Sequence, residues 1–235
     1  MKILAISSST NSLSIAIAAD SKVIGESFYN HIPTLSENIV RYIKILIDET
    51  KTPIKSIQGV VVSKGPGAFT NLRVGITAAK VMSQILTIPI IGLDSLELVA
   101  RNVQVSGSVV VIQKACRNDV NVAIYGMEHF TLTPLSKPFT INTETLAAKL
   151  SDSKGPLYLT GDGASLVFEI IEESIRKAGI YLAPKSTWEP RASTLAFWGQ
   201  ELLERGKQDN VLTLSPVYSH PPNIRKTVYG KNKNI

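Results

Sequence analysis

Hydrophobic and polar residues alternate along this chain in blocks that predict a mixed α/β protein. Short apolar runs rich in β-branched residues, such as residues 59–62, are typical of buried strands. Longer stretches follow in which apolar residues recur every three or four positions, as in residues 70–86, and this spacing predicts amphipathic helices. Strands that alternate with helices indicate sheets covered by helices.

The first half of the chain gives the clearer pattern. We expect strands at residues 3–7, 13–19, 23–29, 59–63 and 89–93, and helices at 35–49, 70–86 and 94–100. The first three strands are joined by short polar turns, so this sheet begins antiparallel. Thr34 followed by Glu37 predicts a capping box for the first long helix, and Asp94 with Glu97 predicts one for the last.

The second half is a looser copy of the same order. We expect strands at residues 109–113, 120–125, 130–132 and 157–160, and helices at 143–150, 164–177 and 193–204. The apolar signal lapses near residues 104–108, so we predict a first lobe over 1–104, a second over 105–215 and a basic tail over 216–235. The fold class is therefore α/β with two lobes.

Composition narrows the function only slightly. The chain has 235 residues, 44% of them hydrophobic, and a net charge of +6. A basic chain of this kind is compatible with nucleic acid or an acidic partner but does not require either. Cys116 is the only cysteine, and no apolar run approaches the roughly 18 residues that span a bilayer. We therefore expect a cytoplasmic protein without membrane contact.

The junction between the strand at 59–63 and the next helix carries the most distinctive residues. Gly65 and Gly67 permit a tight turn, Thr70 is placed to cap the helix, and Arg73 lies one turn further on. Such a corner binds an anion or nucleotide weakly when its N–H groups are free, and otherwise it is a plain turn. It has neither the Lys-Ser/Thr of a P-loop nor the GxGxxG spacing.

The sequence offers few other chemical groups. The histidines at 31, 129 and 220 stand apart, so we predict no metal site. Cys116 lies beside Arg117, which can lower a thiol pKa, but we favour an inert thiol at the end of a strand. Asp162, between two glycines, either binds a ligand or caps the following helix. We predict no catalytic residue and no cofactor.

Residues 65–75, Gly-Pro-Gly-Ala-Phe-Thr-Asn-Leu-Arg-Val-Gly, resemble the signature of the TsaB (YeaZ) family. The resemblance covers about residues 1–100, and residues 161–163 and 216–218 add to it more thinly. It implies the two-lobed fold of actin, sugar kinases and Hsp70. It also implies a role in making N6-threonylcarbamoyladenosine in tRNA, at the adenosine beside the anticodon.

The resemblance further implies partners. TsaB-like proteins are the non-catalytic partner of a paralogue of the same fold, TsaD, which transfers the threonylcarbamoyl group, and a small ATPase, TsaE, joins them. Pairing, with the paralogue or as a homodimer, is implied through the two long helices of the first lobe. The residues we predict at this interface are Leu35, Ile39, Ile43, Arg73, Val81, Met82 and Ile85.

The chain departs from the family pattern at several positions. Ser7 replaces the usual Asp of the first loop, and a serine is a much weaker ligand for hydrated Mg²⁺. Asn71 replaces a glycine of the signature, which Asn can do because it tolerates a left-handed backbone. These changes argue against independent nucleotide binding.

Two interpretations of the function follow. The first is a non-catalytic subunit that partners and activates the TsaD-like transferase. The alternative is a small-molecule kinase or ATPase of the same fold, which Ser7 argues against; a peptidase would need a metal site that the sequence does not offer. Four basic residues of the tail, Arg225, Lys226, Lys231 and Lys233, either contact tRNA phosphates or are simply solvated.

Overall fold

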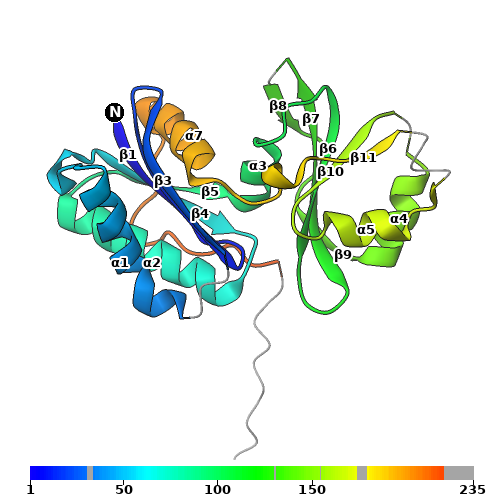
Figure 1. Ribbon diagram of the computed structural model, residues 1–235, viewed down its shortest axis with the longest axis horizontal. Coiled ribbons are helices and arrows are strands. Elements are labelled where there is room, and N and C mark those ends of the chain that lie inside the picture. The colour runs from blue at the N-terminus through cyan, green and yellow to red at the C-terminus, as the bar shows by residue number, and fades with distance from the viewer. Residues whose placement is uncertain (31–33, 130, 154, 174–178, 220–235) are drawn as a thin grey trace, which may run out of the picture.

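The computed structural model describes residues 1–30, 34–129, 131–153, 155–173 and 179–219. His31, His220, Phe130, Lys177 and the basic residues of the tail lie outside these ranges. Two sheets, each with its own helices, stand side by side (Figure 1).

The first sheet has five strands in the order β3-β2-β1-β4-β5. Its strands are β1 (Lys2–Ser7), β2 (Ser12–Ala19), β3 (Lys22–Asn30), β4 (Gly59–Gly65) and β5 (Ile90–Asp94). β1 to β3 are antiparallel, whereas β4 and β5 run parallel to β1 and to each other. β1 and β4 are buried on both faces, which explains their near-continuous apolar sequence.

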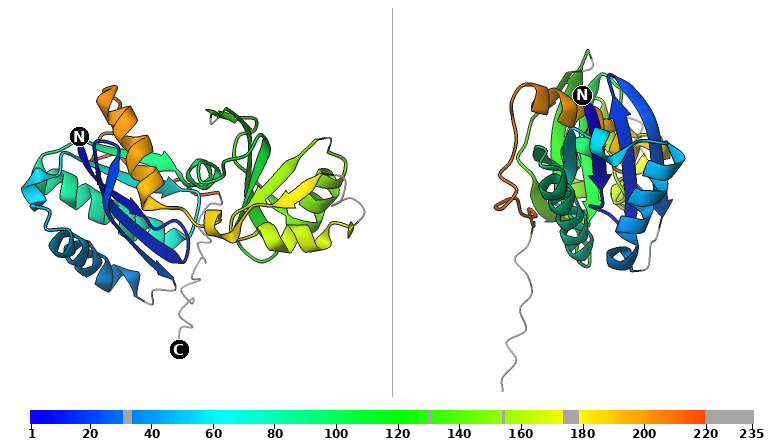
Figure 2. Two further views of the ribbon diagram at one scale, coloured as in Figure 1. Left: turned by 45° about the horizontal axis from the view of Figure 1, so that its top comes forward. Right: turned by 90° about the vertical axis from the view of Figure 1, so that its left-hand side faces the viewer.

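Helices cover both faces of this sheet (Figures 1 and 2). α1 (Leu35–Glu49) and α2 (Phe69–Leu86) pack on one face, where Leu4, Ile6 and Val62 belong to the core. α7 (Ala192–Glu204) packs on the other face against Ile3 and Val61. The outer sides of α1 and α2 are therefore left for solvent or a partner.

The second sheet has the order β11-β10-β6-β7-β8, with β9 also paired to β7. Its strands are β6 (Gly107–Lys114), β7 (Asp119–Glu128), β8 (Thr131–Pro134), β9 (Phe139–Asn142), β10 (Leu157–Thr160) and β11 (Ile180–Leu182). α4 (Thr143–Ser151) and α5 (Ala164–Ile170) bury one face of it. The short helix α3 (Ser95–Ala100) packs on its other face, towards the first lobe.

The end of the chain corrects the predicted lobe boundary at residue 215. After a 3-10 turn at Lys185–Thr187, α7 returns to the first sheet, and Asp209 forms a β-bridge with Ile90 of β5. Leu214 is buried in the core beneath α1 and α2. Residues 192–218 thus pack with the first lobe. They shield the unpaired edge of β5 and bury the face of the first sheet that α1 and α2 do not cover.

Several predicted helix caps also need correction. Thr34 has a left-handed backbone with φ 60° and its side chain makes no capping bond to α1, so the predicted box is absent. Asn142, and not Thr143, accepts the N–H of Glu144 at the start of α4. The predicted box on α3 is confirmed in part: Asp94 accepts from the N–H groups of Leu96 and Glu97 at 2.8 and 2.9 Å, whereas the Glu97 carboxylate pairs with Arg101.

Candidate functional site

The corner between β4 and α2 is filled by the chain's own carbonyl groups. Gly65 has φ 111°, and a side chain there would collide with the carbonyl oxygen of Val217. A side chain at Gly67 would collide with the carbonyl oxygen of Ser9, which also accepts the N–H of Ala68 at 2.8 Å. Because carbonyl oxygens carry the negative end of the peptide dipole, this geometry favours the plain turn over an anion site.

Thr70 and Asn71 differ from their predicted roles. Thr70 is exposed, and α2 begins at Phe69 without a side-chain cap. The Asn71 amide instead donates to the carbonyl oxygen of Thr10 at 2.8 Å, while Ser8 Oγ donates to the Asn71 carbonyl at 2.8 Å. The Asn that departs from the family signature therefore ties the first loop to α2.

The first loop, between β1 and β2, is occupied by a carboxylate of the same chain. Ser12 Oγ donates to Glu189 Oε2 at 2.8 Å, and Thr10 Oγ1 donates to the same oxygen at 3.1 Å. Ser7 Oγ contacts Ser63 Oγ at 3.3 Å. Glu189 comes from the segment that leads into α7, so no local sequence signal links it to this loop.

Asp162 does not cap α5, which begins after Gly163 without a side-chain cap. Its carboxylate accepts the N–H of Lys114 at 2.8 Å and so joins the ends of β6 and β10. Burial raises the pKa of Asp162, and the negative charge of Glu189 raises it further. The carboxylate thus has a structural role at the edge of the second lobe.

The outer face of α1 and α2 exposes large aliphatic side chains. Val40 is 70% exposed, Ile85 73% and Val81 45%. Met82 is half-buried and packs against the core below. Scattered exposed aliphatic residues are ordinary, but these three lie on two helices that contact each other, and we call them the apolar strip of α1 and α2.

Three residues predicted at this interface lie elsewhere. Leu35, Ile39 and Ile43 are 6%, 3% and 5% exposed and belong to the core against the first sheet. The apolar stripe of α1 recurs every four residues, and it faces the sheet. Of the predicted aliphatic set, Val81 and Ile85 are exposed and Met82 only partly so, and Val40 is an exposed residue that the prediction missed.

Arg73 lies exposed near the start of α2 and is held by two aromatic rings. Its guanidinium carbon lies 4.0 Å from the centre of the Phe69 ring, and its Nε donates to Tyr218 Oη at 2.8 Å. The Phe69 and Tyr218 rings stack with 4.6 Å between their centres. Lys80, two turns further along α2, donates to the carbonyl oxygens of Leu212 and Leu214 at 3.1 and 3.2 Å.

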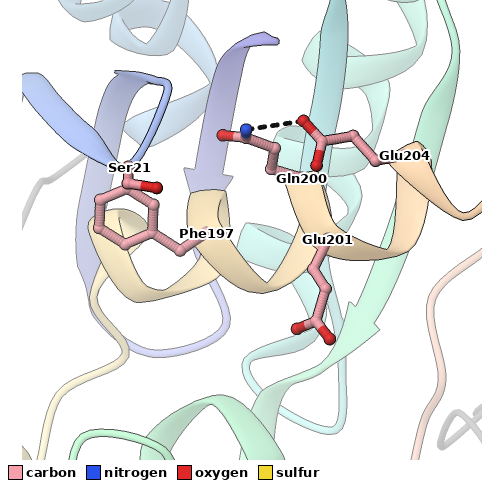
Figure 3. A pocket seen from close by; sticks show the side chains of 5 residues that line it. All are labelled: Ser21, Phe197, Gln200, Glu201 and Glu204. Carbon is pink, nitrogen blue, oxygen red and sulfur yellow. Dashed lines mark hydrogen bonds between the residues drawn. The ribbon is translucent and has the colours of Figure 1, made fainter.

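Neither of two cavities in the described part of the chain gathers the predicted corner residues. One, of about 280 Å³, lies over α7 and is open and acidic, with Gln200 bound to Glu204 at 2.8 Å (Figure 3). The other, of about 210 Å³, lies between the lobes and reaches the corner only at Pro66. It also contacts Asp94, Asn121 and Tyr218.

No group of three His, Cys, Asp or Glu side chains suited to a metal occurs among the residues that the structure describes. His129 and Cys116 are both exposed. In the same ranges, none of the helices has the length and apolar character that crossing a membrane requires.

Comparison with known proteins identifies the relatives of this chain. The model of the TsaD family, described as tRNA N6-adenosine threonylcarbamoyltransferase, matches residues 23–211. The chain is 29% identical over 202 residues to the tRNA threonylcarbamoyladenosine biosynthesis protein TsaB of Bacillus subtilis, covering 86% of this chain and 88% of that protein. It is 28% identical to the TsaB of Buchnera aphidicola from Acyrthosiphon pisum, covering 99% and 91%.

Solved structures agree on the fold. YeaZ from Pseudomonas aeruginosa superposes with a TM-score of 0.77 at 18% identity, covering 92% of this chain and 99% of that one. At this identity the likeness concerns the fold alone. The predicted two-lobed fold of the actin, sugar-kinase and Hsp70 class is confirmed.

Proposed function

Because the chain belongs to the TsaD family, and within it to the TsaB (YeaZ) proteins, we propose that it serves the formation of N6-threonylcarbamoyladenosine in tRNA. In this role it is a subunit without chemistry of its own that partners and activates a TsaD-like transferase. Its curated relatives are named as biosynthesis proteins of this modified nucleoside, which supports the pathway. The exposed apolar strip on α1 and α2 is the structural observation that carries the partner role.

The strip has the features of a protein contact. Val40, Val81 and Ile85 are exposed on two neighbouring helices whose other sides are buried in one core. A partner that covers them removes apolar surface from water, which stabilises association by about 25 cal/mol per Å². Two helices that present such a face favour a partner with helices of its own, packed in a bundle.

The first loop supports a non-catalytic role. In a protein that binds a nucleotide between its lobes, hydroxyl and N–H groups of such a loop are free to bind phosphate. Here Thr10 and Ser12 already donate to Glu189, and Ser7 is paired with Ser63. A phosphate that approached this loop would meet the Glu189 carboxylate, and like charges repel strongly where water is partly excluded.

The remaining partner predictions rest on the family resemblance. These are the contact with a TsaE-like ATPase, a homodimer through the same helices, and a weak contact of the tail with tRNA. We propose that the homodimer and the complex with the transferase use one surface and therefore exclude each other.

The proposal is tested with the TsaD-like protein of the same cell. The two purified chains should form a complex, and adding this chain should restore tRNA modification that the transferase alone does not complete. Ile85→Glu and Val81→Glu should abolish both effects without unfolding the protein, because both side chains are exposed. Leu135→Glu is the matched control, since Leu135 is 59% exposed but lies in the second lobe.

Persistent complex formation by both α2 variants would show that the partner binds elsewhere. ATP turnover by the isolated chain would contradict the non-catalytic role and favour a kinase or ATPase.

A further inference from the structure

Arg73 differs from the other exposed cations of the first lobe because its position is fixed before any partner binds. Phe69 lies against one face of its guanidinium, and Tyr218 accepts from its Nε. The two rings also stack on each other, so the support is itself rigid. Ordering a long side chain on binding normally costs affinity, and here that cost is already met in the free protein.

The charge of Arg73 is nevertheless unpaired. Within the part of the chain that the structure describes, no carboxylate lies within ion-pair distance of it, and its two terminal nitrogens donate to no described group. Other exposed cations have acidic neighbours: Lys44 pairs with Asp48, and Arg205 pairs with Glu201. The outer edge of the Arg73 guanidinium is thus free to bind a further acceptor.

The place of Arg73 suggests where this acceptor comes from. On an α-helix each residue is rotated by about 100° and rises by about 1.5 Å, so Arg73 lies about 80° around α2 and about 12 Å along it from Val81. It therefore lies on the exposed side of α2, a little over two turns before Val81, where it can form the rim of a contact centred on the exposed aliphatic residues. Interfaces have this layout, with apolar residues at the centre and charged residues at the rim.

We propose that Arg73 binds a carboxylate on the protein that covers the apolar strip of α1 and α2. A carboxylate fits because the guanidinium edge offers two parallel N–H donors, which match the two oxygens of Asp or Glu. A protein fits better than a nucleic acid because the same helix also exposes the aliphatic side chains of Val81 and Ile85. This inference rests on the proposed function, in which that protein is the TsaD-like transferase.

Binding kinetics of the full-length chain to the TsaD-like protein test the proposal. Arg73→Met should weaken the complex about tenfold, chiefly through faster dissociation, because a fixed, bidentate ion pair is lost. Arg205→Met is the matched control: the Arg205 side chain is 64% exposed and lies just after α7, which packs on the opposite face of the first sheet from α2. It removes the same charge and should change the affinity by less than about threefold.

Two more variants separate the ion pair from simple charge. Arg73→Lys keeps the charge without the planar fork and should lose most of the affinity that Arg73→Met loses. Tyr218→Phe keeps the ring but removes the acceptor of Nε, and an intermediate loss is expected. Thermal unfolding of each variant shows whether its fold is intact. If Arg73→Met does not fold, the affinities of Arg73→Lys and Tyr218→Phe still test the proposal.

The outcomes are distinct. If the unaltered chain does not bind the transferase, the proposed function and this inference both fail. If it binds and Arg73→Met matches Arg205→Met, only the inference fails. If Arg73→Met binds the transferase normally but loses affinity for tRNA, the acceptor is a phosphate and the inference is overturned.

Discussion

Ser12 donates a hydrogen bond of 2.8 Å to Glu189, although 177 residues separate them in the sequence. The bond joins the first loop to the segment that brings the chain back from the second lobe. Thr10 donates to the same carboxylate oxygen at 3.1 Å. The loop that holds phosphate in enzymes of this fold thus serves here to fasten the two halves of the chain together.

Replacing Glu189 should destabilise the protein. Glu189→Ala removes the shared acceptor of the Thr10 and Ser12 hydroxyl groups, which lie 2.7 Å apart, so one of these two buried hydroxyl groups can donate to the other and the second loses its acceptor. We expect a loss of about 1–3 kcal/mol in the free energy of unfolding, measured by urea denaturation. Glu189→Gln keeps one acceptor oxygen and should lose less.

A stability of Glu189→Ala equal to that of the unaltered chain would show that the loop does not depend on this carboxylate. Leu212→Ala, at an exposed position of the first lobe, is a suitable control because little buried surface changes.

The sequence predicted most strands because the runs of β-branched residues in β1, β4 and β6 are long and buried on both faces. It failed where local signals are ambiguous. Thr34 and Glu37 have the spacing of a capping box, but the spacing does not reveal that Thr34 has a left-handed backbone. The periodic stripe of α1 gave the correct helix but not the direction in which Ile39 and Ile43 point.

Long-range contacts could not be predicted. Nothing near Glu189 in the sequence indicates the first loop, and nothing near Tyr218 indicates Arg73, which lies 145 residues earlier. The packing of α7 on the first sheet could not be predicted for the same reason. Its apolar stripe fits either sheet, and only the complete fold shows which sheet it covers. The candidate site is built largely from such contacts, so its residue types were predictable but its geometry was not.

Gly67 should be intolerant of any side chain. A Cβ there would overlap the carbonyl oxygen of Ser9, which is backbone and held by the N–H of Ala68. We expect Gly67→Ala to lower the free energy of unfolding by about 1–3 kcal/mol, since the first loop must shift. Gly126→Ala is the control, because a Cβ at Gly126 would meet only side-chain atoms of Leu135 at 3.6 Å or more.

If the two glycine variants unfold at the same denaturant concentration, the close approach of the first loop to the corner is wrong. The same experiment at Gly75, whose Cβ would overlap the Ser8 hydroxyl, gives a second measure of that approach.

The ion pair of Glu26 should make stability depend on pH. Burial acts to raise the pKa of Glu26, but hydrogen bonds from Arg191, Ser193 and Ser14 outweigh it, so the pKa is lowered from 4.5. Because the folded pKa is the lower one, the contribution is fully present above pH 4.5 and is lost as the pH falls through the folded value. Glu26→Gln should therefore be less stable than the unaltered chain at pH 7.

The difference in free energy of unfolding between Glu26→Gln and the unaltered chain should shrink as the solution is acidified below pH 4.5. Urea denaturation at several pH values measures this difference. Arg205→Met gives a comparison, since its partner Glu201 is largely exposed and contributes little. If this difference in free energy stays constant down to the lowest pH at which the protein folds, Glu26 does not titrate as its contacts predict.

The segment from Asp209 to Tyr218, which follows α7, should stabilise the first lobe. Asp209 accepts the N–H of Gly92 at 2.8 Å, Leu214 is buried in the core, and Tyr218 supports Arg73. Removing residues 220–235 leaves all of these contacts in place, and this truncated chain is the reference. Removing residues 209–235 opens the edge of β5 and takes a leucine from the core, which alone costs about 2–5 kcal/mol. Thermal unfolding of the two truncated chains, followed by their binding to the TsaD-like protein, compares these effects directly. Equal midpoints for the two truncations would show that the segment merely lies on the first lobe and does not stabilise it.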